Sequence, residues 1–355
     1  MVDFCGLGKV RLDADAPAAD ETDTNEPGAE YRFLEALSEK ARARWLAALL
    51  DSGNLRARVA GLFLEGKFAD FKSQHVTAQE ARDELVQLAV GANDPAIYSM
   101  AVYMCQSRAE GSGSGACRQI SWQAWARADP DNVFPWLALA GMARTNNDPA
   151  AESDAFNHAA QAHRSDTYMD SQLALAQSLF PADVSALERS VIATQVIGIE
   201  AALPMPPYHP LLKHCAIAAM QDAGVKEQCE TLAEILTAHS GSILDFAMGL
   251  AIGKRAGWPA AQIDAMEQEK DAMMESIMRV TPPGDADPWS CAGVARLNDY
   301  VSLRNQLGEI GAARVLGERS GASVPELARR YAEDMEKILH GAQQQAQAQA
   351  QESQP

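Results

Sequence analysis

The cysteines are the residues of this chain whose spacing says most about chemistry. Four of the six flank two predicted turns, with both members of a pair about equally far from the middle of the turn. The two pairs are Cys105 and Cys117, around residues 110–115, and Cys215 and Cys229, around residues 222–224. Positions equidistant from the turn of an antiparallel helix pair face each other, at the ~4.4–6.8 Å between Cα atoms that a disulfide requires. We therefore expect two short-range disulfides, with Cys5 and Cys291 left as a third, long-range pair.

Two other uses of these cysteines are less favoured. Zinc sites take cysteines two to four residues apart with histidine nearby, and these spacings do not fit, so we expect no metal. His209, His214 and Cys215 lie close together in sequence and suggest a Cys–His nucleophile. A disulfide at Cys215 would abolish that activity.

No other segment carries a catalytic motif. His158 and Asp154 are four residues apart, the spacing of a stabilising pair on a helix surface. Residues 111–115 look like a Gly-rich phosphate loop but lack a preceding strand and a lysine, which favours a flexible turn. The sequence implies no cofactor and favours a protein that is not an enzyme.

Charge excludes several partners. The chain has 48 acidic and 30 basic residues, a net charge of −18. Such a surface repels the phosphates of nucleic acids and anionic membranes. No apolar run approaches the ~18 residues that span a bilayer, so we expect no membrane insertion. A basic partner is compatible with this charge.

The compartment depends on the cysteines. Structural disulfides form in oxidising compartments, which favours the periplasm or the outside of the cell. The first residues show no basic segment followed by an apolar one, the pattern of a signal peptide, and this alone would favour the cytoplasm. We expect the oxidising compartment and keep the cytoplasm as the alternative.

Helical periodicity runs through most of the chain, with alanine dominant and aromatic residues at 6%. These features predict an all-α fold of antiparallel helix pairs with disordered termini. The sharpest break is the Pro-rich segment at 203–207. The expected units are an acidic linker at 1–30, helical halves at 31–203 and 204–340, and a Gln/Ala-rich tail at 341–355.

Residues 130–160 carry the clearest pattern, two short amphipathic helices joined by a tight turn. They resemble one unit of the tetratricopeptide (TPR) repeat, which is about 34 residues long. The matching positions are Trp136 and Leu139 on the first helix, Phe156 and Ala159 on the second, and Pro130 where the preceding unit would end. Ala140, Ala143 and Glu152 depart from the pattern, and the rest of the chain matches weakly. The resemblance implies a degenerate TPR-like α-solenoid with a concave, partner-binding face.

This resemblance predicts a non-catalytic scaffold that binds a protein or peptide. If an aromatic side chain lines the binding groove, Trp125 and Tyr168 are the candidates. Two alternatives remain: an all-α enzyme whose site is assembled from helices distant in sequence, and a secreted effector or assembly factor. A deep pocket with clustered acids would favour the enzyme, whereas a shallow groove with exposed aromatic residues would favour the scaffold.

Overall fold

The computed structural model describes residues 2–12, 28–68, 75–106, 115–203, 208–239, 241–281 and 287–352. Over these ranges the chain is almost entirely helical, and the expected all-α class is confirmed. The exception is an antiparallel hairpin of two short strands, β1 (Val2–Phe4) and β2 (Gly8–Val10).

The helices follow one another along most of the described chain. Up to residue 203 they are α1 (Ala29–Leu50), α2 (Leu55–Lys67), α3 (Ala78–Gly91), α4 (Pro95–Cys105), the 3-10 helix η1 (Gly115–Gln119), α5 (Trp122–Ala128), α6 (Val133–Thr145), α7 (Pro149–Gln161), α8 (Met169–Ser178) and α9 (Ala186–Ala201). Beyond it they are α10 (Tyr208–His214), the 3-10 helix η2 (Ala219–Gln221), α11 (Ala223–Ala238), α12 (Ile243–Ala256), α13 (Ala260–Met278), α14 (Cys291–Arg319) and α15 (Val324–Glu352).

Local sequence sets many of these boundaries. The Asp148 side chain accepts a hydrogen bond from the backbone N–H of Ala151, and Pro149 fills the first helical position of α7. Thr77 and Glu80 form a reciprocal capping box at the start of α3. Inside α14, Gly308 has a φ of 72°, so this helix kinks there.

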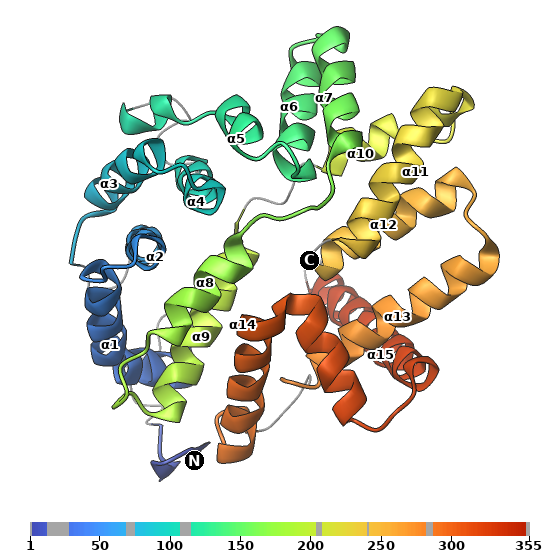
Figure 1. The fold of residues 1–355 in the computed structure, drawn as a ribbon. Coiled ribbons are helices and arrows are strands. Elements are labelled where there is room, and N and C mark those ends of the chain that lie inside the picture. The colour runs from blue at the N-terminus through green and yellow to red at the C-terminus, as the bar shows by residue number, and fades with distance from the viewer. Residues whose placement is uncertain are drawn as a thin grey trace.

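The order of the helices in space departs from a simple array. Figure 1 shows α1 to α7 laid out along an arc, after which the chain returns through the middle of the molecule. In a simple array α8 would pack on α7, the helix before it. Instead α8 packs on α2, and α9 packs on α1. The indole of Trp45 on α1 is fully buried and donates a hydrogen bond from Nε1 to the Ala176 carbonyl on α8 (2.8 Å). The start of the chain therefore packs against its middle.

The predicted halves 31–203 and 204–340 are not independent packing units. Helix α14 packs on both α8 and α9, across the expected boundary, while α10 and α11 pack on α6 and α7. Residues 204–207 of the Pro-rich break lie outside the described part of the chain.

The first residues form structure where the sequence predicts a linker. Phe4 on β1 is fully buried, and it packs in a cluster with Leu34 of α1, Val191 of α9 and Val294 of α14. The backbone N–H of Cys5 donates to the Trp289 carbonyl (2.9 Å). The linker prediction is thus wrong for residues 2–12. Strands of three residues each are too short for an alternation of apolar and polar residues to be recognised in the sequence. Residues 13–27 lie outside the described residues.

The predicted disordered tail also differs. Helix α15 continues to Glu352, well into the Gln/Ala-rich segment. Alanine and glutamine both have high helix propensity, and extending an existing helix avoids the cost of nucleation. Lack of bulky apolar residues therefore does not end the helix.

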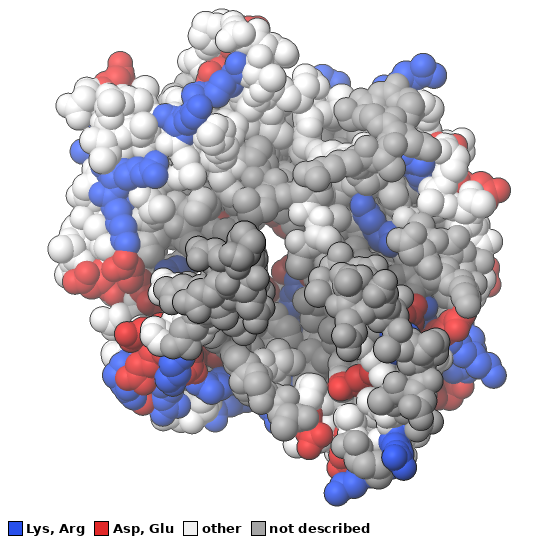
Figure 2. Space-filling view, turned by 180° about the vertical axis from the view of Figure 1, so that it is seen from behind, with Lys and Arg blue, Asp and Glu red and all other residues white. Residues whose placement is uncertain are grey.

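The surface agrees with the charge of the sequence. On the face shown in Figure 2, Lys and Arg side chains lie scattered among Asp and Glu and form no single basic patch. Among the described helices, none is long and apolar enough to cross a membrane.

We predict that removing the long-range disulfide costs stability. Cys5 and Cys291 are 286 residues apart in sequence, and closing so large a loop removes much conformational freedom from the unfolded chain. The double variant Cys5→Ser/Cys291→Ser should lose roughly 2–5 kcal/mol of unfolding free energy, measured by denaturant titration. The matched variant Cys105→Ser/Cys117→Ser, with a separation of 12, should lose less. Unchanged midpoints for the first variant would contradict the prediction.

Candidate functional site

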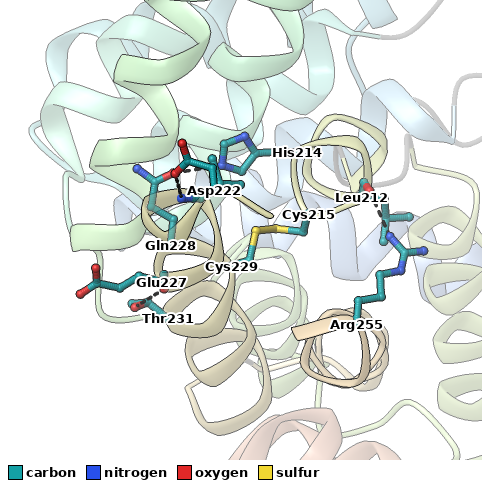
Figure 3. Close-up of a disulfide and its surroundings, with 10 residues drawn as sticks. Leu212, His214, Cys215, Asp222, Glu227, Gln228, Cys229, Thr231 and Arg255 are labelled. Carbon is teal, nitrogen blue, oxygen red and sulfur yellow. Dashed lines mark hydrogen bonds between the residues drawn. A yellow bond between two sulfur atoms is a disulfide. The ribbon is translucent and has the colours of Figure 1, made fainter. Parts of the chain in front are cut away.

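The six cysteines form the three pairs that the sequence predicts. The Cα–Cα distances are 4.4 Å for Cys5–Cys291, 5.6 Å for Cys105–Cys117 and 5.7 Å for Cys215–Cys229. The surroundings differ in detail from two facing helices. Cys117 lies on the 3-10 helix η1. Cys215 follows the end of α10, and Figure 3 shows its bond to Cys229.

This pairing removes the Cys–His nucleophile. The sulfur of Cys215 is bonded to that of Cys229, so no thiolate is present there. Beside it, the imidazole of His214 stacks on Phe156, with 3.8 Å between centroids. Its Nε2 lies 3.0 Å from Gln228 Oε1 (Figure 3). Burial lowers the pKa of His214, so it is held as a neutral packing residue.

The two helices expected at residues 130–160 are α6 and α7, which pack on each other. Phe156 on α7 is fully buried between these helices and their neighbours. Trp136 donates from Nε1 to the Pro130 carbonyl (3.0 Å) and stacks on His158 (4.3 Å). His158 Nε2 lies 3.9 Å from Asp154, the surface pair that the spacing predicts. The indole therefore holds both helices and the preceding turn together.

A surface groove runs along this unit. One cavity of about 440 Å³ lies between α5, α6 and α7, and a second of about 390 Å³ lies beside the Cys105–Cys117 disulfide. Both are lined by Gln123 and Met142, so they adjoin. We call this surface the α5–α7 groove. Its apolar lining residues are Trp122, Trp136, Leu139 and Met142, and its polar ones include Gln123, Arg127, Asp148, Asp154 and His158.

The aromatic residues of the groove are not the ones predicted. Trp125 is fully buried and stacks on Trp122 (5.4 Å), so it cannot line a groove and that prediction is wrong. Trp122, on the same short helix, lines the groove instead. The two positions are neighbours on a seven-residue helix, too short for its periodicity to show which side faces the core.

Tyr168 is partly buried, and its hydroxyl is engaged by neighbouring side chains. Its hydroxyl donates to Asp129 Oδ2 (2.9 Å) and accepts from Arg164 Nη2 (2.6 Å). Its backbone is left-handed, with a φ of 61°. Burial and the Asp129 carboxylate raise the pKa of Tyr168 above its usual range. The residue fixes the turn before α8 and lines neither cavity of the groove.

A second group of polar residues lies in the middle of the fold. Arg304 on α14 donates to Asp170 on α8 (2.6 Å) and to Glu200 on α9 (2.5 Å), and only 15% of its side chain is exposed. Nearby, the Tyr208 hydroxyl donates to Asp245 on α12. We call Asp170, Glu200, Asp245 and Glu309 the central carboxyl cluster. They come from four helices distant in sequence, so no local motif could reveal them.

Burial raises the pKa of three carboxyl groups in this cluster. It raises the pKa of Asp245 to about 6, and the nearby Asp166 carboxylate adds to the effect. Burial likewise raises the pKa of Glu200, where a hydrogen bond with Asp170 reinforces it and Arg304 opposes it. Burial also raises the pKa of Glu309. A hydrogen bond from the Ile243 N–H to Glu309 Oε2 (2.9 Å) opposes this rise. Within the described residues no cluster of His, Cys, Asp or Glu is arranged to hold a metal ion.

Comparison with known proteins adds no relative: no family model, curated protein or solved structure matches this chain.

We predict that the free energy of unfolding falls as pH rises from 5 to 8. A carboxyl whose pKa is raised by folding binds its proton more tightly in the folded state. It therefore stabilises the fold fully below its unfolded pKa, and that contribution is lost as pH rises through the folded pKa, about 6 for Asp245. Asp245 alone should account for about 1 kcal/mol over this range.

Denaturant titrations at several pH values measure this effect. The variants Asp245→Asn and Glu200→Gln should each flatten the pH dependence, because an amide does not titrate. A surface control, Glu234→Gln, should leave it unchanged. Stability that is flat or increases with pH in the unmodified protein would contradict the prediction.

Proposed function

We propose that this chain is a non-catalytic interaction scaffold, a degenerate α-solenoid of TPR-like pairs that binds a protein or peptide segment along the α5–α7 groove. The observation that carries the proposal is the groove itself, which lies on the helix pair with the TPR-like pattern. It combines an open apolar floor with a polar rim, the composition of surfaces that bind peptides.

The floor offers anchoring positions for a partner. Met142 is 42% exposed although it lies between the two cavities, and its flexible thioether adapts to varied side chains. Leu139, three residues earlier on α6, continues the apolar strip toward Trp136. A partner that presents apolar residues at helical spacing, or an apolar peptide, would cover this strip.

The rim supplies polar contacts of both signs. Arg127 lies on one side of the groove, and Asp148 and Asp154 lie on the α7 side. Charges at the rim of an interface set orientation and rate of association more than affinity. The partner should therefore carry mixed charge beside its apolar anchors. A nucleic acid would be repelled by the acidic surface.

Packing between successive helices supports the solenoid part of the proposal. Helix α2 packs on α1 and α3, α6 on α7, and α11 on α12, as neighbours in an array do. The return of α8 and α9 to the start of the chain departs from a regular solenoid. Three disulfides support an oxidising compartment, the periplasm or the cell exterior, with the cytoplasm as alternative.

An all-α enzyme is the second candidate, and the central carboxyl cluster is the observation in its favour. Buried acids with raised pKa values are common at catalytic sites. In this cluster, however, Asp170 and Glu200 bind Arg304, and Tyr208 binds Asp245. Carboxyls engaged in this way join helices, which favours a structural role.

We predict that binding depends on Met142. A phage library of random 16-residue peptides, selected on the unmodified protein, should yield sequences with apolar residues at helical spacing. Met142→Glu should lower the affinity of these peptides roughly tenfold or more. The substitution places a charge where an apolar side chain of the peptide would be buried. Affinities are measured by fluorescence anisotropy on labelled peptides.

The matched control is Leu244→Glu. Leu244 on α12 lies outside the groove and is 41% exposed, close to the 42% of Met142. Both variants therefore replace a similarly exposed apolar side chain with glutamate. Thermal unfolding of both variants checks that the fold is intact. Equal loss of affinity in both variants, or no enriched peptides, would refute the proposed groove.

A further inference from the structure

A second, larger concavity lies on another part of the molecule. It has a volume of about 930 Å³ and lies between α8 and α14, with residues of α9 and the preceding turn also lining it. We call it the α8–α14 trough. It shares no lining residue with the α5–α7 groove. Its size is within the range of ligand sites in proteins.

The chemistry of the trough is unlike that of the surface. None of the described residues that line it is acidic, in a chain with 48 acidic residues. Among the described lining residues Arg189 is the one with a charge. Its guanidinium donates to backbone carbonyls, including those of Val184 (3.1 Å) and Pro181 (3.3 Å). The other polar lining residues are amides and hydroxyls. A ligand that fits this lining is therefore uncharged.

One amide has unused hydrogen-bonding capacity. Gln177 is only 8% exposed and lines the trough, yet its side chain has no hydrogen-bond partner within the described part of the chain. Its amide atoms are not among the fully buried unpaired polar atoms of the described residues, so they still reach solvent at the surface of the trough and are open to a ligand. Across the trough, Asn305 on α14 makes no side-chain hydrogen bond to any described residue either. Both groups are available to a ligand.

We propose that the α8–α14 trough binds an extended, uncharged peptide segment. An amide side chain both donates and accepts, which matches the alternating N–H and C=O groups of an extended backbone. Between these amides, Leu175 and Val301 provide apolar surface for the side chains that point inward. Asn298 and Asn305 are seven residues apart on α14, about 10 Å, the length of roughly three extended residues.

A carbohydrate is a poorer fit for the same lining. Sugar rings need an aromatic face, and Phe180 is the aromatic residue of the trough. One face of its ring is covered by Trp45, at 4.6 Å between centroids and 26° between planes. The ring is thus part of the packing between α1 and the turn after α8.

The test uses the full-length Met142→Glu variant, so that peptides that need the α5–α7 groove are not enriched. Random 10-residue peptides displayed on phage are selected on this protein, and the enriched pool is sequenced. We expect sequences depleted in Asp, Glu, Lys and Arg. Synthetic peptides from the pool should bind roughly tenfold more weakly when Gln177→Leu is added to the protein. A loss of this size is expected when one hydrogen bond to the Gln177 amide is removed.

A matched amide-to-leucine change elsewhere is the control. Gln87→Leu, on an exposed position of α3, should leave affinity unchanged. Asn305→Leu should repeat the loss from the other wall of the trough. No enriched peptide on Met142→Glu, or binding insensitive to both trough variants, would overturn the proposal while leaving the α5–α7 groove unaffected. Enrichment of charged sequences would overturn it as well.

Discussion

The contact of α1, α9 and α14 under the N-terminal hairpin is the constraint on which the rest of the fold depends. Phe4 fills the space between these helices, which come from the start, the middle and the end of the chain. The Cys5–Cys291 bond fixes the hairpin there. An open array of helix pairs exposes an apolar face at each end. Here α8 and α9 pack on α2 and α1, and α14 packs in turn on α8 and α9.

The two shorter disulfides act on the part of the molecule that carries the α5–α7 groove. Cys105–Cys117 joins the end of α4 to the segment that leads into α5, and it borders the groove itself. Cys215–Cys229 holds α10 to α11, and both helices pack on the α6–α7 pair. A β-carbon at Gly141 would lie 2.9 Å from the Pro210 ring, so α6 and α10 approach closely. The groove is thereby built on a covalently supported base, which would lower the entropy lost on binding the proposed partner.

Sequence patterns identified the helices, and the equidistant cysteines identified their pairing, because both depend on local spacing. The return of α8 to α2 could not be found in this way. Alanine-rich helices have weakly defined apolar faces, so their neighbours depend on contacts such as Trp45 to Ala176, 131 residues apart. The same holds for Arg304, whose partners are 134 and 104 residues away. Trp125 was mistaken for a groove residue because its helix is too short to show a face.

Disulfide mapping is the decisive measurement for a helical fold closed by three covalent bonds. The unreduced protein is alkylated under denaturing conditions, digested and analysed by mass spectrometry, with a reduced sample as reference. The account predicts three linked peptide pairs, Cys5–Cys291, Cys105–Cys117 and Cys215–Cys229, and no alkylated cysteine before reduction. Free thiols at Cys5 and Cys291 in protein from an oxidising host, or a different pairing, would contradict it.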